Sequence, residues 1–368
     1  QLAGTLSVLL SITALIWSSL LIRPWWQQRR PPSEKELIEK RYGYNNEEKS
    51  LEKLLLTFLV THLSFNLKEK LPATWEQFLA PKKTDSMIFV DSFMNHAGDG
   101  KFYDQLARQA EDTLKLKDYL DKWDQDKFLE CDTFKSIDMA ILTNLRNSLL
   151  EDIEQFSKSR EIIEQRRKSH WFQEFADEYE ALYHALGLLE AKKKLGKAIT
   201  GENAAEMIDK YAKRYFRLDQ YYRKFYIHYD RINRKETLAP LAEKIENSYA
   251  HWFLDELSIK WSEALANHLP QGYSLPGIKK QQGFYDDNVL PHIRRNERVF
   301  VIISDGLRYE IGEELRGLLQ GELRGAATLS YMQGVVPSTT KMGMTSLLPG
   351  ANIEITGRGD LVKDGINT

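Results

Sequence analysis

The sequence predicts an α + α/β fold, in which a largely helical N-terminal region precedes the first half of an α/β domain with a mostly parallel sheet. From about residue 33 to about residue 269, glycine is sparse and apolar residues return every three or four positions, which is the helical period. Proline and glycine then concentrate at 270–283 and indicate a linker. The run RVFVIIS at 298–304 follows, and β-branched apolar runs of this kind are typical of strands buried on both faces of a parallel sheet.

Bulk composition limits the class of protein. The 368 residues suffice for two or three domains, and 42% hydrophobic with 28% charged residues is typical of a soluble globular protein. A net charge of -2 argues against a protein that coats nucleic acid or anionic membrane by charge alone. The single cysteine, Cys131, excludes an internal disulfide and indicates a reducing cytoplasm. Because no Cys/His cluster has zinc-finger spacing, we expect carboxylate, hydroxyl and histidine groups to hold any metal.

Residues 1–32 form the first predicted segment, an apolar helix. No charge occurs through residue 22, and Trp25, Trp26 and two arginines follow, so a membrane span is one interpretation. Serines recur on one side of this stretch at helical spacing, which favours a helix buried against another helix, and we expect no membrane partner. The chain starts at Gln1 rather than Met and stops at Thr368 in mid-pattern, so we expect a piece of a longer protein.

Residues 33–269 form the predicted helical domain. A short strand is expected at Met87–Val90, and the clearest single helix at 211–232. Its large side chains step by four and three along one seam: Tyr211, Tyr215, Leu218, Tyr222, Phe225, Tyr229 and Ile232. Basic residues interleave with these rings, so base stacking is an alternative role. The regularity of the seam favours packing against a partner helix instead.

After a linker at 270–297, residues 298–368 form the predicted α/β domain. The apolar run is followed by a helix at about 309–319 and an extended stretch at 326–336, which together make a βαβ unit. In open α/β sheets the working groups lie at the carboxyl ends of the strands. Asp305 follows the first strand and Thr340 follows the second.

Each of these two residues has a structural and a catalytic interpretation. Asp305 could cap the next helix, and Thr340 could be an N-cap. Alternatively, Asp305 is presented into a crevice beside Gly306, and the Thr340 hydroxyl lies at a helix N-terminus, where the dipole and free N–H groups favour a phosphoryl group. Local physics leaves both interpretations open.

The strings VFVIISDGLRYE at 299–310 and VVPSTTKMGMTSLLPG at 335–350 resemble the metal-binding strand and the nucleophile segment of the PglZ family. PglZ proteins belong to the alkaline phosphatase superfamily and are components of bacterial BREX phage-defence systems. The resemblance covers roughly residues 40–368, so 298–368 looks like the N-terminal part of an alkaline-phosphatase-like domain, truncated at Thr368. The resemblance extends to further strings, which support the family assignment but carry no catalytic role. They are CDTF at 131–134 with ID at 137–138, RRKSHWF at 166–172, YYRKF at 221–225, NSY at 247–249, WFLD at 252–255, and VKDG at 362–365.

The resemblance implies a two-metal phosphoesterase. Asp305 would be the first metal ligand, and Thr340 the nucleophile that also contacts metal, with two divalent ions, of which zinc is expected. The remaining Asp and His ligands would follow Thr368, and His268 and His292 are expected to be linker or surface residues.

This sequence departs from the superfamily pattern at a position that contacts phosphate. A related branch of the superfamily has an asparagine three residues after the nucleophile, where this chain has Gly343. Lys341 or Arg308 could supply substrate-binding charge instead.

We therefore expect a cytoplasmic, metal-dependent phosphoric ester hydrolase of a BREX antiviral defence system. Its partners would be other BREX proteins, and its substrate a nucleic-acid or nucleotide phosphodiester, which is the analogy that the defence context offers. The alternative is a non-catalytic docking subunit with a degenerate phosphatase fold, which Gly343 favours.

Overall fold

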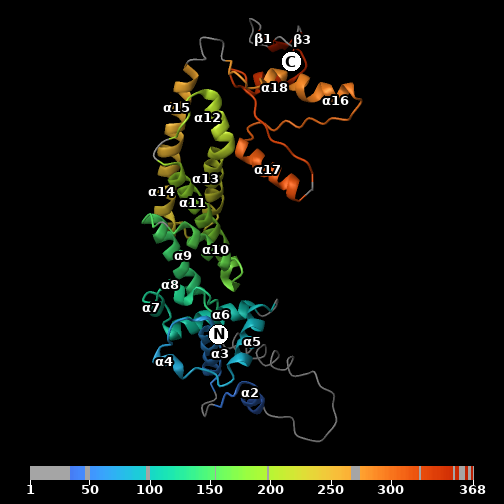
Figure 1. Cartoon of the computed structure of the whole chain (residues 1–368). Coiled ribbons are helices and arrows are strands. Elements are labelled where there is room, and N and C mark those ends of the chain that lie inside the picture. Colours follow the sequence, from blue (N-terminus) through green and yellow to red (C-terminus); the bar gives the residue numbers. More distant parts are fainter. Residues whose placement is uncertain are drawn as a thin grey trace. The chain divides into compact units, whose positions relative to one another are not determined.

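The computed structural model describes residues 34–45, 50–96, 100–153, 155–196, 199–266, 274–322, 325–350, 353–355, 361–363 and 366–367. Helices dominate these residues, and the strands among them occur only near the C-terminal end (Figure 1). The apolar helix expected within 1–32 lies outside the described residues. None of the helices in the described part combines the length and the apolar character that a bilayer crossing needs.

The chain divides into two compact units. The first comprises Gln1–Leu186 with His228–Leu241, and the second comprises Gly187–Ile227 with Ala242–Thr368. The helical region expected at 33–269 is therefore shared between the units. α11 (Ala176–Leu195), α13 (Phe216–Tyr229) and α14 (Ala239–Asn247) each contribute residues to both.

The first unit consists of helices joined by short turns. Ser50 is the N-cap of α3 (Leu51–Asn66), because its hydroxyl accepts a hydrogen bond from the Lys53 N–H at 3.3 Å. The other elements confined to this unit are α2 (Glu34–Tyr42), α4 (Ala73–Glu76), α5 (Lys83–Met94), α6 (Gly100–Leu114), α7 (Lys117–Leu120), α8 (Gln125–Phe128), α9 (Lys135–Leu150), α10 (Phe156–Arg166), and the 3-10 helices η1 (His170–Glu174) and η3 (Lys235–Thr237).

A buried ion pair lies in the core of this unit. Arg166 donates to both carboxylate oxygens of Asp138, at 2.9 and 2.5 Å, and to the carbonyls of Leu129 and Cys131, at 3.1 and 2.8 Å. Both charged side chains are buried, and this full set of partners offsets the cost of removing them from water. Burial raises the pKa of the Cys131 thiol to about 12, so this cysteine is not a thiolate nucleophile.

Helices predominate in the described part of the second unit, and a small sheet lies near its C-terminal end. Its remaining elements are α12 (Ala204–Lys210), the π-helix η2 (Tyr211–Tyr215), the π-helix η4 (Ser248–Leu254), α15 (Asp255–Ala266), the 3-10 helix η6 (Gln281–Gly283), the π-helix η7 (Tyr285–Val289), α16 (Leu290–Arg294), α17 (Tyr309–Gly321), α18 (Thr340–Leu347), β1 (Ile353–Ile355), β2 (Leu361–Lys363) and β3 (Ile366–Asn367). The linker expected at 270–297 thus contains three short helices.

The aromatic seam is packed as predicted. None of its side chains is exposed, and Tyr215, Leu218 and Phe225 are buried. The Tyr222 ring stacks on Tyr249 with centroids 3.7 Å apart. The expected helix begins as η2 and ends at Tyr229. Its seam is buried or half-buried throughout, which argues against base stacking on this face.

The predicted parallel sheet is absent from the described residues. Residues 299–304 form neither a helix nor a strand, and Phe300 and Ile302 are 85% and 91% exposed. The sheet that is described is antiparallel, with order β1-β2-β3 and Ile353 opposite Lys363. A strand buried on both faces requires neighbouring strands and covering helices, and the described residues supply neither to this run. The stretch 326–336 likewise makes only one isolated bridge, from Gln333 to Lys280.

The strand expected at Met87–Val90 is also wrong. These residues lie inside α5, where Val90, Phe93 and Met94 are buried at helical spacing. The spacing of apolar residues every three to four positions therefore determines the structure of this segment, and the short β-branched and aromatic run within it does not.

Candidate active site

Thr340 is the first residue of α18, and the N-cap of that helix is its neighbour. The Thr339 hydroxyl accepts a hydrogen bond from the Met342 N–H at 3.4 Å. Because Thr339 is the N-cap, Thr340 does not have the capping role that was one of its two interpretations. The Thr340 hydroxyl points elsewhere.

Asp305 and Thr340 are brought together although 35 positions separate them. The Thr340 hydroxyl donates a hydrogen bond to Oδ2 of Asp305 at 2.9 Å, and both residues are exposed. Asp305 lies in a turn with Gly306, whose φ of +71° is in the left-handed region that glycine adopts without strain. A carboxylate and a hydroxyl therefore meet at an open surface.

These two oxygens form a donor set suited to a divalent metal ion. At 2.9 Å they are close enough to contact one ion at the usual distance of about 2 Å from each. In the described part of the chain, the one group of three or more His, Cys, Asp or Glu side chains placed to hold a metal does not include Asp305. The pair is thus part of a possible ligand set.

Gln281 holds the start of α18 in place. Its side-chain amide donates to the Gly343 carbonyl at 3.1 Å, and its amide oxygen accepts from the Val335 N–H at 3.3 Å. One side chain from the expected linker thus fixes both the segment before Thr340 and the helix after it. Sequence reasoning missed Gln281, because no motif singles out a glutamine in a Pro/Gly-rich stretch.

The three residues considered for phosphate binding have different surroundings. Lys341 is exposed beside Thr340. Gly343 has no side chain to donate, although an added Cβ would meet only Gln281 Nε2 at 3.6 Å, an ordinary contact distance. Arg308 interacts with Tyr249 and Asp219. Of the two basic residues, Lys341 is the one adjacent in sequence to Thr340.

α17, which follows the Asp305 turn, is anchored by charge. Arg223 on α13 donates to both oxygens of Glu310, at 2.7 and 2.8 Å, and to Glu314 at 2.6 Å. Lys224 pairs with Glu314 at 2.7 Å. The hydrogen bond to Glu310, whose side chain is fully buried, is the main cause that raises the pKa of Arg223. This network was not predicted, since YYRKF and SDGLRYE are far apart in the sequence.

His292 is at the surface, as expected. Its Nδ1 lies 2.6 Å from Glu297, which Arg295 also contacts. Hydrogen bonds from Arg295 and His292 lower the pKa of Glu297 to about 2. His268 lies outside the described residues. A hydrophobic pocket of about 290 Å³ between α12 and α15 includes none of the predicted site residues.

Comparison with known families agrees with the sequence motifs. Residues 284–368 match the family model described as the BREX system PglZ alkaline phosphatase-like domain. The match begins inside the expected linker and contains both Asp305 and Thr340.

Two curated proteins are similar to most of this chain. An alkaline phosphatase-like protein PglZ of Bacillus cereus (strain H3081.97) is 37% identical over 333 residues, which are 89% of this chain and 39% of that protein. An alkaline phosphatase-like protein BrxZ of Escherichia coli O9:H4 (strain HS) is 32% identical over 348 residues, 90% of this chain and 40% of that protein. The chain thus spans about two fifths of the length of the curated relatives it matches. No solved structure matches the chain. The matches confirm the resemblance to the PglZ family.

Proposed function

We propose that this PglZ-family chain is part of a cytoplasmic BREX defence protein that hydrolyses phosphoric esters, with Thr340 as the nucleophile. The observation that carries the proposal is the 2.9 Å contact between the Thr340 hydroxyl and Asp305 within the matched domain segment. The names of the similar proteins and of the matched family supply the BREX context.

The residues of the chain have distinct tasks in this proposal. Asp305 holds a metal ion and orients the Thr340 hydroxyl, with which it is hydrogen-bonded. The complete site would hold two divalent ions, which are zinc in our proposal. One of them would lower the pKa of the Thr340 hydroxyl, and bound metal would offset the negative charge of the phosphate. The Thr340 hydroxyl loses its proton to water as its oxygen attacks phosphorus, and the leaving oxygen departs and takes a proton from water. Thr340 then carries the phosphoryl group, still esterified when the substrate is a diester, until water hydrolyses it. Lys341 is placed to contact the phosphate.

The complete domain would also change the surroundings of residues 299–304. We propose that this run becomes a buried parallel strand when the remainder of a PglZ-type domain covers it. Its exposed apolar side chains, Phe300 and Ile302 above all, support this assignment.

Neighbouring threonines provide a matched test in the full-length protein. Thr340→Ala should lower metal-dependent turnover of an aryl phosphoester by at least about a thousandfold, because the nucleophile is lost. Thr339→Ala keeps the nucleophile and removes the N-cap, so it should cost about 1 kcal/mol of stability while turnover persists. Asp305→Ala should lose turnover through metal affinity, and excess metal should partly restore it.

A docking subunit without catalytic activity is the second candidate, favoured by the absence of a side-chain donor at Gly343. It predicts that Thr340→Ala leaves any phosphoesterase rate unchanged. Loss of phage defence with an unchanged rate in both Thr340→Ala and Asp305→Ala would place the docking role first.

A further inference from the structure

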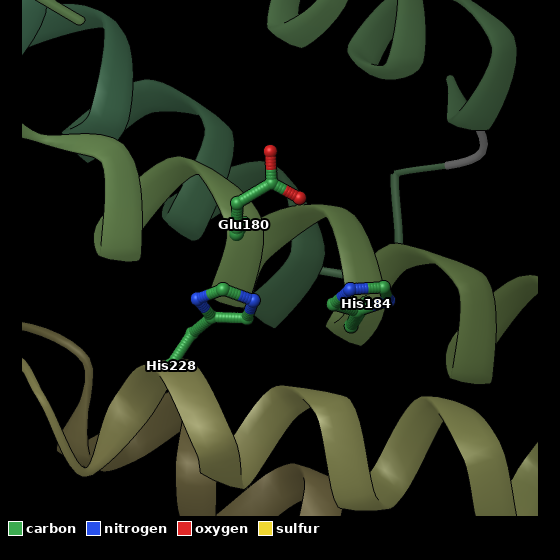
Figure 2. A group of neighbouring side chains, drawn as sticks. All are labelled: Glu180, His184 and His228. Atoms are coloured by element: carbon green, nitrogen blue, oxygen red, sulfur yellow. The ribbon is translucent and has the colours of Figure 1, made fainter. Parts of the chain in front are cut away.

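Three side chains of the first unit gather their donor atoms at one place. Glu180 and His184 lie on α11, and His228 lies on α13. One ligand atom from each lies within 4.8 Å of the other two, and Figure 2 shows His228 extending from α13 towards the helix that carries Glu180 and His184.

Helical spacing produces this convergence. Glu180 and His184 are four residues apart, which places them on one face of α11, and Asp177 precedes Glu180 by three on the same face. The imidazoles of His184 and His228 stack with centroids 5.8 Å apart and planes 17° from parallel. The convergence itself is shown by the donor atoms, since two imidazole nitrogens and one carboxylate oxygen lie within 4.8 Å of one another.

Asp177 fixes how His228 presents its ring. Nδ1 of His228 lies 2.7 Å from Oδ1 of Asp177. When Nδ1 carries the proton and donates it to this carboxylate, Nε2 has a lone pair for a metal ion. A carboxylate behind a metal-binding histidine is the usual arrangement, because it sets the tautomer and makes the imidazole more basic.

Burial and charge also fit a cation. His184 is buried, while Glu180 and His228 are half-buried, so an ion can enter from one side. Glu180 and Asp177 bring two carboxylates to the two imidazoles. Arg167 Nη2 donates to Oε2 of Glu180 at 3.0 Å and lies 2.7 Å from Oε1. Because each carboxylate oxygen has more than one lone pair, an oxygen that accepts from Arg167 can also bind metal.

We propose that Glu180, His184 and His228 bind a divalent transition-metal ion of the zinc type, with Asp177 as a positioning residue for His228. Two imidazoles and one carboxylate form a three-residue set that zinc accepts, and water completes the fourth position. The ion would tie α11 to α13 inside the first unit. This site shares no residue with the Asp305–Thr340 pair, so it stands independently of the proposed phosphoesterase.

Co²⁺ binding tests the proposal, since the visible spectrum of this ion reports its ligands. The 368-residue chain with Asp305→Ala, which removes the metal-binding carboxylate of the other site, should bind one equivalent of Co²⁺. His228→Gln and Glu180→Gln, each added to that background, should abolish the spectrum, and Asp177→Asn should weaken binding by about 10- to 100-fold. Zn²⁺ should displace Co²⁺ and raise the Tm of the parent but not of the ligand variants.

His170→Gln is the matched control, because His170 also pairs with an aspartate, Asp104, at 2.8 Å, but lies outside the cluster. It should bind Co²⁺ like the parent. Circular dichroism identifies a variant that fails to fold, and the two ligand variants allow the conclusion to rest on the one that folds. No Co²⁺ binding by the Asp305→Ala chain, or equal binding in it and in folded His228→Gln or Glu180→Gln, would overturn the proposal.

Discussion

Thr339 and Thr340 are adjacent residues of the same type with different surroundings. Thr339 accepts from the Met342 N–H and caps α18, which leaves the Thr340 hydroxyl for Asp305. A serine- or threonine-rich turn into a helix ordinarily needs one capping hydroxyl. The second hydroxyl, directed at a carboxylate 2.9 Å away, is the feature that a capping role leaves unexplained.

The pH dependence of stability should reflect Asp219. Burial raises the pKa of this carboxyl above its usual 3.8, although Tyr211 and Tyr249 donate hydrogen bonds to it. The folded chain therefore binds this proton more tightly than the unfolded chain. The stabilisation is complete below the unfolded pKa and is lost as pH rises through the raised folded pKa. The free energy of unfolding of the parent, relative to Asp219→Asn, should therefore fall as pH rises above the usual carboxyl value of 3.8. A difference that stays constant or rises with pH would contradict this.

At the scale of elements, periodic patterns were predictable and isolated runs were not. The seam through Tyr215, Leu218 and Phe225 was correctly placed in the core, because several turns of regular spacing specify one face of a helix. Met87–Val90 looked like a strand because four residues are too few to separate the two periods. Residues 299–304 have strand composition, but a strand needs partners that no local pattern contains.

The candidate site was predictable only through its motifs. Asp305 and Thr340 were singled out because both follow predicted strands and match family strings, and they do meet. Gln281 and the Arg223–Glu310 pair were not predicted, since their contacts span 62 and 87 positions. The metal-ligand cluster was missed for the same reason, because His184 and His228 lie on different helices.

The anchoring of α17 gives a prediction at this scale. Arg223→Met should destabilise the second unit by about 3 kcal/mol, because it leaves the buried Glu310 carboxylate without its guanidinium. Lys224→Met is the matched control: it removes only a half-exposed pair with Glu314 and should cost less than about 1 kcal/mol. Urea unfolding of the 368-residue chain measures both. Equal losses for the two variants would show that Glu310 does not depend on Arg223.

At the scale of the whole molecule, residues of the family motifs form ion pairs inside each unit. In the first unit, Asp138 and Arg166 form the buried ion pair. In the second, Arg223 of the string YYRKF binds Glu310 of the string that contains Asp305. These helical strings therefore have a structural role: one contributes to the core of the first unit, and the other holds α17, the helix that follows the Asp305 turn.

The identity of the nucleophile is the central claim, and trapping the covalent intermediate tests it most directly. The full-length protein would be mixed with a metal ion and an aryl phosphoester, quenched in acid, digested and analysed by mass spectrometry. We predict a phosphoryl or aryl-phosphoryl group on the peptide that contains Thr339 and Thr340, located on Thr340 by fragmentation and absent from Thr340→Ala. Steady turnover with the group on another residue, or with Thr340→Ala as active as the parent, would contradict the account.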